Sequence, residues 1–345
     1  IAFLGFGVSG GADGARHGPA IMAGGDKNAI ARVAPIFSAV AAKHCDQPCF
    51  VACGPGGAGH FVKMVHNGIE YAVMQLQAEI YALLRDRGLA APQIADAFTR
   101  YNAGDLGSFL LECAIRALRA EESGGALVDL IMDTASQKGT GAWAAIAALE
   151  LGIPTPSLAE AVFARCLSAL RDERLAESQE LAPRARRATL DPEATLDRCG
   201  AALGAANVAI HAQGFALMEA ASGEHGWSLD LGAVARAWRN GCIIRSHLME
   251  VIADALAGDP APLNLLRLPA LRREFDAREA AYRQLMREAD QQPLPVLSAS
   301  LAYVDGYRQP RSGANLIAAQ RDVFGRHGFA RIDRPGRFNA EWPRA

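Results

Sequence analysis

The sequence predicts a mainly α-helical protein that begins with a short α/β segment, and three observations support this class. Residues 1–6 and 48–53 are short apolar runs typical of buried strands, with a helical pattern between them. From Gly59 onward, apolar residues recur at helical spacing in nearly every segment. The length of 345 residues, with 50% hydrophobic and 21% charged residues, fits a globular chain of more than one domain.

A glycine-rich segment follows the first strand. Gly5, Gly7 and Gly10 match the GxGxxG fingerprint of dinucleotide-binding folds. We reject this interpretation, because the fingerprint needs a helix that opens at its third glycine, whereas further glycines and a proline interrupt the chain beyond it. Such a loop can still offer backbone N–H groups to an anion, with Ser9 as a hydroxyl donor.

The remaining elements are predicted to be helices. The strand pair encloses a helix over 26–43, and this strand–helix–strand unit is too small to stand alone. A long helix is expected from Gly59 to about Arg87, ending at Gly88. Further helices are expected near residues 92, 105 and 125, over 137–152, 157–176, 194–221 and 229–257, in two stretches up to 308, and near 315–324, with a loop at 181–192.

The last 36 residues, 310–345, differ in character from the rest. Arginine, glycine and proline occur throughout, as in a disordered end. The segment nevertheless holds too many apolar residues for a free tail, namely Leu316, Ile317, Val323, Phe324, Phe329, Phe338 and Trp342. We therefore expect it to pack against something, such as a partner subunit.

Composition limits the classes of partner and location. The net charge of −2 gives no general attraction to nucleic acid or to an anionic membrane. We identify no stretch that is long and apolar enough to span a membrane, and no signal peptide. The chain opens on an apparent strand at Ile1 rather than on Met, so we expect the start of the protein to be missing.

Seven scattered cysteines fit reduced thiols in a cytosolic protein. Cys45, Cys49 and Cys53 recur every fourth residue, which raises the possibility of a metal site. Pro48 argues against one helix that carries all three, and no His/Cys pair elsewhere has zinc spacing. We favour unliganded thiols and expect no metal.

The richest stretch for chemistry is GGAGHFVKMVHNGIEY, residues 56–71. Lys63, His66, Asn67 and Glu70 are spaced i, i+3, i+4 and i+7, so a helix places all four on one face. A solvated polar stripe is the ordinary interpretation of such a face. His and Asn are poor choices for an exposed helix, however, and the glycine-rich entry gives a ligand close access to the backbone. The pattern therefore favours a proton-transfer site.

Two further segments suggest anion binding. Lys138 and Thr140 lie in KGTG at the start of a helix, where free N–H groups and the helix dipole favour a phosphate. An ordinary threonine N-cap explains this segment equally well. Arg245 lies among apolar neighbours, as either a snorkelling surface residue or a bidentate phosphate ligand.

Separated blocks along the whole chain resemble the 6-phosphogluconate dehydrogenase family: GVSGGADGARHGP, GAGHFVKMVHNGIEY, QKGTGAWAAI, EAVFARCLSAL, HAQGFALM, AWRNGCIIRS and ANLIAAQRDVFGRH. The resemblance implies the family's all-helical C-terminal domain, preceded by the last strand–helix–strand of a Rossmann-type α/β domain. It implies oxidative decarboxylation of 6-phospho-D-gluconate to D-ribulose 5-phosphate and CO2 with reduction of NADP, in the pentose phosphate pathway and gluconate utilization. It also implies a cytoplasmic homodimer that exchanges its C-terminal tails.

The resemblance assigns roles to individual residues. Lys63 matches the general base that takes the C3 hydroxyl proton, and Glu70 matches the general acid that protonates C1 of the enediol. The other matched positions are substrate ligands. Ser9, Gly10, Gly11, His66 and Asn67 match the carboxylate and hydroxyl end, Tyr71, Lys138, Thr140 and Arg245 match phosphate ligands, and Arg321 and His327 match tail residues that reach the neighbouring subunit's site.

The chain also departs from the family pattern, which leaves a second interpretation open. We expect residues 1–56 to be the remnant of an NADP-binding domain, 57–309 a helical substrate and dimerisation domain, and 310–345 the tail. The family's main cofactor-binding residues precede Ile1, so no cofactor ligand is assigned. Alanines replace usual residues at Ala12, Ala20, Ala23, Ala72 and Ala142. The alternatives are a truncated, non-catalytic dimeric sugar-phosphate-binding protein, or the same reaction with NAD.

Overall fold

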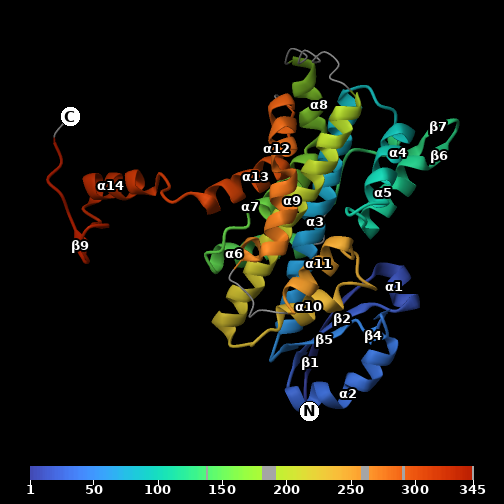
Figure 1. Ribbon diagram of the computed structural model, residues 1–345, viewed down its shortest axis with the longest axis horizontal. Helices are drawn as coiled ribbons and strands as arrows, with labels where there is room; N and C mark the ends of the chain where they lie inside the picture. The colour runs from blue at the N-terminus through green and yellow to red at the C-terminus, as the bar shows by residue number, and fades with distance from the viewer. Residues whose placement is uncertain (137–138, 181–191, 258–263, 290–291, 344–345) are drawn as a thin grey trace. The chain divides into compact units, whose positions relative to one another are not determined.

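In the computed structural model, helices form most of the chain and one small sheet lies near the N-terminus (Figure 1). The structure describes residues 1–136, 139–180, 192–257, 264–289 and 292–343. The chain divides into two compact units, residues 1–301 and 302–345, and each is described by itself. The predicted class, mainly α-helical with an α/β start, is confirmed.

The sheet contains three strands in the order β1 (Leu4–Ser9), β2 (Ala20–Gly25) and β5 (Phe50–Gly54). β1 is antiparallel to β2, and β2 is parallel to β5. Helix α2 (Lys27–Val40) connects the parallel pair and begins at Asp26, whose side chain accepts a hydrogen bond from the Ala29 N–H. A hairpin of β3 (Lys43–His44) and β4 (Gln47–Pro48) precedes β5.

The expectation that no helix opens after the third glycine is wrong. Helix α1 (Gly11–His17) begins directly after Gly10, because Gly10 and Gly11 adopt φ angles of 135° and 61° that turn the chain out of β1. This helix joins two antiparallel strands, whereas the dinucleotide fingerprint belongs to a parallel βαβ unit. The fingerprint is therefore still rejected, because the helix joins antiparallel strands and not because a helix is missing.

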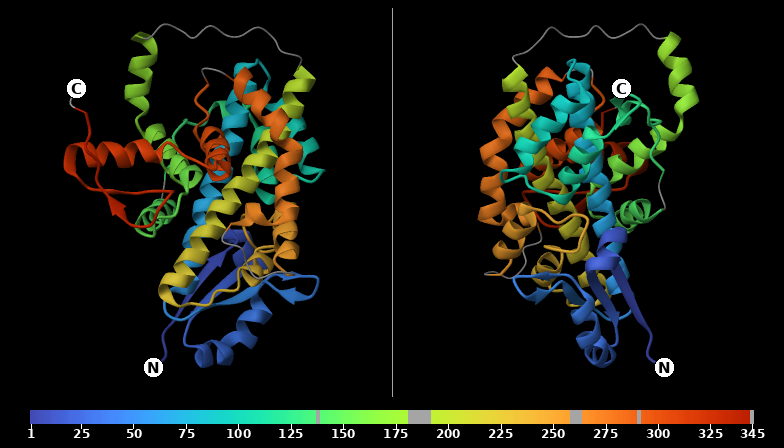
Figure 2. Two further views of the ribbon diagram at one scale, coloured as in Figure 1. Left: turned by 60° about the vertical axis from the view of Figure 1, so that its left-hand side comes forward. Right: turned by 90° about the vertical axis from the view of Figure 1, so that its right-hand side faces the viewer.

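Three long helices form the centre of the helical region. α9 packs against both α3 and α12, and Figures 1 and 2 show the three running side by side. The bounds of the helices in the first unit are α3 Ala58–Asp86, α4 Ala91–Asn102, α5 Phe109–Arg119, α6 Thr140–Glu150, α7 Pro156–Ala169, α8 Arg171–Glu180, α9 Pro192–His225, α10 Leu231–Ala237, α11 His247–Ala255 and α12 Pro269–Glu288, with short 3-10 turns at Leu127–Asp129 and Leu265–Arg267.

Three predicted helices need correction. The stretch 229–257 is two helices, because Gly241 turns the chain at φ 62° and Ser246 caps α11 by accepting from the Met249 N–H. The stretch 157–176 is divided into α7 and α8 at Leu170. Near residue 125 the chain forms a hairpin of β6 (Glu121–Glu122) and β7 (Gly125–Ala126) instead of a helix. The predicted loop at 181–192 lies almost wholly outside the described residues.

Helix α9 (Pro192–His225) is longer than the predicted helix over 194–221. By length and composition, residues 193–225 pass the test for a helix that crosses a membrane, which contradicts the expectation that no stretch would do so. Within the fold, however, 83% of the apolar 18-residue stretch of this helix is buried. A buried apolar helix of this length is also what the core of a large helical domain requires.

Glycines allow α3 to rest directly on the backbone of the sheet. A Cβ added to Gly7 on β1 would lie 2.4 Å from the Cβ of Lys63, and one added to Gly59 would lie 2.4 Å from the Met22 carbonyl oxygen. A Cβ at Gly24 would lie 2.6 Å from the Gly59 nitrogen. No side chain fits in these gaps, so the close approach of α3 to β1 and β2 depends on glycine.

The second unit begins at Ala302 within helix α13 (Pro295–Arg308) and continues through α14 (Ala314–Gly325) and a hairpin of β8 (Phe329–Ala330) and β9 (Arg337–Phe338). Asp322 is buried and accepts hydrogen bonds from the Gly328 and Ala340 N–H groups, Asn339 and the Trp342 indole. Burial alone would raise the pKa of this carboxyl, but the hydrogen bonds lower it to about 2. A carboxylate thus organises the tail locally.

Glu79, buried on α3, holds the start of α13. Its two carboxyl oxygens accept from the Val296 and Leu297 N–H groups, each at 2.9 Å. These donors belong to the first turn of the helix, where N–H groups have no partner within the helix. A side chain 217 residues away in sequence therefore caps α13.

We expect Glu79→Ala to lower the free energy of unfolding by about 2 to 4 kcal/mol, because it leaves two buried N–H donors without an acceptor. Glu79→Gln keeps one acceptor oxygen and should give an intermediate loss. Urea denaturation followed by circular dichroism measures both. Glu177→Ala, on an exposed position of α8, is the matched control and should change stability by less than about 0.5 kcal/mol. Equal stability of the Glu79 and Glu177 variants would refute the capping role.

Candidate active site

The four polar residues of α3 lie together on one face, as the spacing predicts. The Lys63 Nζ lies 3.0 Å from the Nδ1 of His66, and the Asn67 Oδ1 lies 3.3 Å from the same atom. The nearer Glu70 oxygen is 3.6 Å from this nitrogen. His66 is fully buried and the other three are half-buried, so this face is not a solvated stripe.

The opposite nitrogen of His66 meets two other segments of the chain. Its Nε2 lies 2.9 Å from the Ser9 Oγ at the end of β1 and 2.8 Å from the Cys242 Sγ in the segment after α10. The Ser9 Oγ also accepts a hydrogen bond from the Ile243 N–H. One buried imidazole therefore joins the sheet, α3 and residues 238–246.

Cys242 was not among the predicted site residues. It is fully buried, and its partner His66 lies 176 residues earlier in the chain. No local pattern around a single cysteine indicates such a contact. In the sequence, Cys242 is marked only by its place in the AWRNGCIIRS block, from which Arg245 was the predicted ligand.

Burial shifts the pKa values of the lysine and the glutamate in opposite directions. It lowers the pKa of Lys63, although the charge of Glu70 opposes this shift. It raises the pKa of Glu70, against the charges of Lys63 and Arg165. It also lowers the pKa of His66 well below its usual range, and the Lys63 charge acts in the same direction. The amine is thus more readily neutral and the carboxyl more readily protonated than in water.

A second group of side chains adjoins this face. Asn67 donates from its Nδ2 to the Thr140 Oγ1 at 2.8 Å, which brings the start of α6 to the site. Gly141 lies against the Tyr71 ring so closely that a Cβ there would be 2.4 Å from a ring carbon. Lys138, predicted to bind phosphate beside Thr140, lies outside the described residues.

An arginine that was not predicted lies at this second group. The guanidinium carbon of Arg165, on α7, is 3.5 Å from the centre of the Tyr71 ring. Arg245, the predicted ligand, instead stacks 3.6 Å above the Phe109 ring and donates to the Cys242 carbonyl. The contacts therefore place Arg165, and not Arg245, beside Tyr71. The sequence block EAVFARCLSAL contained this arginine, but nothing local distinguished it.

The predicted glycine loop follows Ser9 directly. Gly10 is buried, and a Cβ there would lie 2.6 Å from the Gly241 carbonyl oxygen. Gly11 is exposed, and the nearest side-chain atom to a Cβ there would be the Ile243 Cδ1 at 3.8 Å. Residues 9–11 thus lie next to the segment that carries Cys242.

The two predicted tail residues lie in the second unit. Arg321 is on α14 and His327 follows that helix, and both are exposed. The His327 ring lies edge-on to Phe324. The backbone N–H of His327 donates to the Arg321 carbonyl oxygen. The structure places these two residues near each other, and their predicted role in a neighbouring subunit's site stays a prediction.

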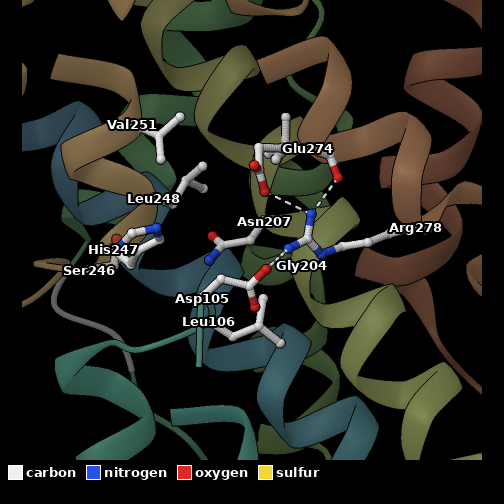
Figure 3. A pocket seen from close by; sticks show the side chains of 11 residues that line it. Asp105, Leu106, Gly204, Asn207, Ser246, His247, Leu248, Val251, Glu274 and Arg278 are labelled. Atoms are coloured by element: carbon white, nitrogen blue, oxygen red, sulfur yellow. Dashed lines mark hydrogen bonds and ion pairs between the residues drawn. The ribbon is translucent and has the colours of Figure 1, made fainter. Parts of the chain in front are cut away.

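A separate small cavity lies between α9, α11, α12 and the loop before α5 (Figure 3). Arg278 forms ion pairs there with Asp105 and Glu274. The cavity has a volume of about 20 Å³, which is enough for one water molecule but not for a sugar phosphate. Its lining includes none of the residues of the α3 site.

Two family models match the chain. The model of the 6-phosphogluconate dehydrogenase C-terminal domain matches residues 59–342. The model of the NAD binding domain of 6-phosphogluconate dehydrogenase matches residues 1–54. Together they span nearly the whole chain, and their boundary coincides with the transition from the sheet to α3.

Similar proteins carry the same description. The decarboxylating 6-phosphogluconate dehydrogenase of Drosophila melanogaster is 44% identical over 342 residues, which cover 98% of this chain and 71% of the relative. Bacillus subtilis (strain 168) has an NADP(+)-dependent form, 44% identical, and an NAD(+)-dependent form, 43% identical, each matched over 99% of this chain and 74% of its own length.

A solved structure has the same fold. Plasmodium falciparum 6-phosphogluconate dehydrogenase, described in its apo form, with NADP+ and with 6-phosphogluconate, aligns with a TM-score of 0.95 at 35% identity. The alignment covers 98% of this chain and 74% of that one. The arrangement of sheet and helices described above is therefore shared with an experimentally solved relative.

We expect Lys63 to lose its proton at a pH below the usual lysine value of 10.5, because burial disfavours the ammonium. Glu70→Gln should lower the pKa of Lys63 further, since it removes a negative charge that favours the ammonium. The chain has only four lysines, so NMR titration of ¹³Cε-labelled lysine can resolve Lys63. Glu250→Gln, on α11, is the control and should leave the Lys63 titration unchanged. A Lys63 that titrates at or above 10.5 would contradict the expected shift.

Proposed function

The chain belongs to the 6-phosphogluconate dehydrogenase family, and from this premise we propose that it catalyses the oxidative decarboxylation of 6-phospho-D-gluconate to D-ribulose 5-phosphate and CO2. The observation that carries the proposal is the pairing of Lys63 and Glu70 around a buried imidazole, with burial moving the two pKa values in the directions that acid–base chemistry needs. A general base must be neutral and a general acid must hold a proton near the working pH.

In the proposed mechanism the residues of this chain move protons. The Lys63 amine accepts the proton of the C3 hydroxyl as that carbon is oxidised, and the resulting 3-keto acid loses CO2. The Glu70 carboxyl then protonates C1 of the enediol. The nicotinamide coenzyme supplies the hydride acceptor. Asn67 and Thr140, joined by a 2.8 Å hydrogen bond, fix the amide beside Lys63 so that it can bind a substrate hydroxyl.

The substrate is proposed to lie along the α3 face. Ser9, Gly10, Gly11, His66 and Asn67 are assigned to its carboxylate and hydroxyl end. Its phosphate is assigned to Tyr71 on α3, to Lys138 and to Thr140. Thr140 is the first residue of α6, where free N–H groups and the helix dipole favour an anion. We add Arg165 to this phosphate group in preference to Arg245, because Arg165 stacks on Tyr71.

The glycines of β1 do not form a dinucleotide cradle. The glycines of β1 face α3: a Cβ at Gly5 would lie 2.7 Å from the His60 ring, and one at Gly7 would touch Lys63. These glycines serve strand–helix packing, so they leave no open backbone for a pyrophosphate. We therefore assign no described residue to coenzyme binding. We propose NADP as the coenzyme, with NAD as the alternative, and relative turnover with the two coenzymes decides between them.

We further propose that the chain acts as a cytoplasmic homodimer in the pentose phosphate pathway and gluconate utilization. Exposed large apolar side chains support an interface between copies. On α6 and α7 these are Trp143, Ile146, Leu149, Phe163 and Leu167, and on α14 they are Leu316, Ile317, Val323 and Phe324. Patches of this kind mark interaction surfaces in soluble proteins. The tail is the segment we assign to the partner's site, through Arg321 and His327.

Lys63→Ala should lower kcat by about 100-fold or more, the usual contribution of a general base, while largely sparing the binding of 6-phosphogluconate. Reduced coenzyme and CO2 measure turnover, and calorimetric titration measures binding. Lys27→Ala, on an exposed position of α2, is the matched control and should retain turnover. Unchanged turnover in Lys63→Ala would end the general-base assignment.

Removal of residues 310–345 should weaken both dimerisation and the binding of 6-phosphogluconate, because the tail is proposed to complete the partner's site. Light scattering measures the mass in solution, and calorimetry measures the affinity. Phe324→Ser tests the same interface with an intact tail, and Gln320→Ser, an exposed polar position on α14, is its control. If the shortened protein keeps both its mass and its affinity, the tail-exchange proposal is wrong.

A further inference from the structure

We propose that the Cys242 thiol positions His66 by donating a hydrogen bond to its Nε2, and that this favours the neutral, proton-accepting form of Lys63. The inference rests on the proposed role of Lys63 as the general base. Cys242 does not itself touch the reacting atoms. It acts through the buried His66 imidazole, which lies between Cys242 and Lys63.

The imidazole of His66 faces a different partner on each side. On the Nδ1 side lie the Lys63 Nζ at 3.0 Å and the Asn67 Oδ1 at 3.3 Å. On the Nε2 side lie the Ser9 Oγ at 2.9 Å and the Cys242 Sγ at 2.8 Å. Because His66 is fully buried and its pKa is well below the usual range, the ring is neutral and carries one N–H.

A neutral ring allows two arrangements, and each matches one protonation state of Lys63. If Nε2 carries the hydrogen, Nδ1 is an acceptor and pairs with the ammonium form of Lys63, which can only donate. If Nδ1 carries the hydrogen, it pairs with the lone pair of the neutral amine, and Nε2 becomes the acceptor. Any group that donates to Nε2 therefore favours the arrangement in which Lys63 is neutral.

Cys242 is such a donor. Burial raises the pKa of its thiol to about 12, so the S–H keeps its proton. The backbone N–H of Ile244 and the Ser9 side chain also hydrogen-bond to the sulfur, and the His66 Nε2 lies 2.8 Å from it, within reach of the S–H. The Ser9 hydroxyl can donate or accept and so fits either arrangement, and its oxygen already accepts from the Ile243 N–H. Since sulfur is a weak acceptor, Cys242 favours only one arrangement.

The other titratable groups around the pair act by charge rather than by choice of tautomer. Glu70 favours the ammonium of Lys63, and the charge of Arg165 acts to lower the pKa of Glu70. His211, on α9, is fully buried with a pKa of about 4, so it is neutral at working pH. A Cys242 thiolate would likewise favour the ammonium. The protonated Cys242 thiol therefore lowers the pKa of Lys63, whereas the thiolate would raise it.

The test compares Cys242→Ala, Cys242→Ser and the matched control Cys199→Ala in the full chain. Cys199 is a fully buried cysteine on α9 whose pKa burial also raises to about 12, so its removal leaves a gap of the same size away from His66. Ring-¹⁵N histidine NMR reads the tautomer of His66, assigned with a His66→Gln sample. The acid limb of kcat/KM for 6-phosphogluconate reads the protonation of Lys63.

We expect Cys242→Ala to shift His66 toward the Nε2–H tautomer and to move the acid limb upward by about 0.5 to 1 pH unit, the equivalent of one lost hydrogen bond. Cys242→Ser keeps a donor but can also accept, so it should shift both readouts in the same direction as Cys242→Ala but by less. Cys199→Ala should leave both unchanged.

Two outcomes would overturn the inference. One is a His66 tautomer that does not respond to Cys242→Ala. The other is an equal shift in the alanine and serine variants, which would indicate packing rather than a donor. Failure of the proposed function is seen separately, as turnover that survives Lys63→Ala. In that case the tautomer readout, which needs no substrate, still decides whether Cys242 positions His66.

Discussion

The close contact between α3 and the sheet is the constraint on which the site depends. Gly7, Gly24 and Gly59 leave no room for a Cβ, so the helix lies directly on the strand backbone. This brings the first turns of α3 against the end of β1, where Ser9 reaches His66. Ordinary side chains at the interface would separate helix from sheet and remove the contact that joins the two elements.

Burial against the sheet also creates the chemistry of the site. The same polar face on a solvated helix would carry a charged lysine and an ionised glutamate. Here Lys63 and Glu70 are half-buried next to a fully buried His66, so the charged form of each is disfavoured. The neighbouring His66 and Asn67 keep their polar atoms satisfied through hydrogen bonds with β1, α6 and the segment after α10.

Long-range polar contacts fix the rest of the helical region in the same way. Glu79 supplies the cap that α13 lacks, and Asp322 gathers four donors within the tail. In each case a carboxylate satisfies backbone N–H groups that local structure leaves free. By contrast, the apolar side chains of α6, α7 and α14 stay exposed within the single chain, which is why we assign them to contact with another copy.

The sequence by itself determined the helical class, the bounds of α3 to within a residue, and the common face of Lys63, His66, Asn67 and Glu70, because all of these follow from spacing within one helix. It did not determine where the chain turns. The helix after Gly10 and the break at Gly241 depend on positive φ angles that tertiary packing holds in place. Only the tertiary structure brought Cys242 to His66, and Arg165 instead of Arg245 to Tyr71, because such contacts join segments whose separation leaves no periodic signal in the sequence.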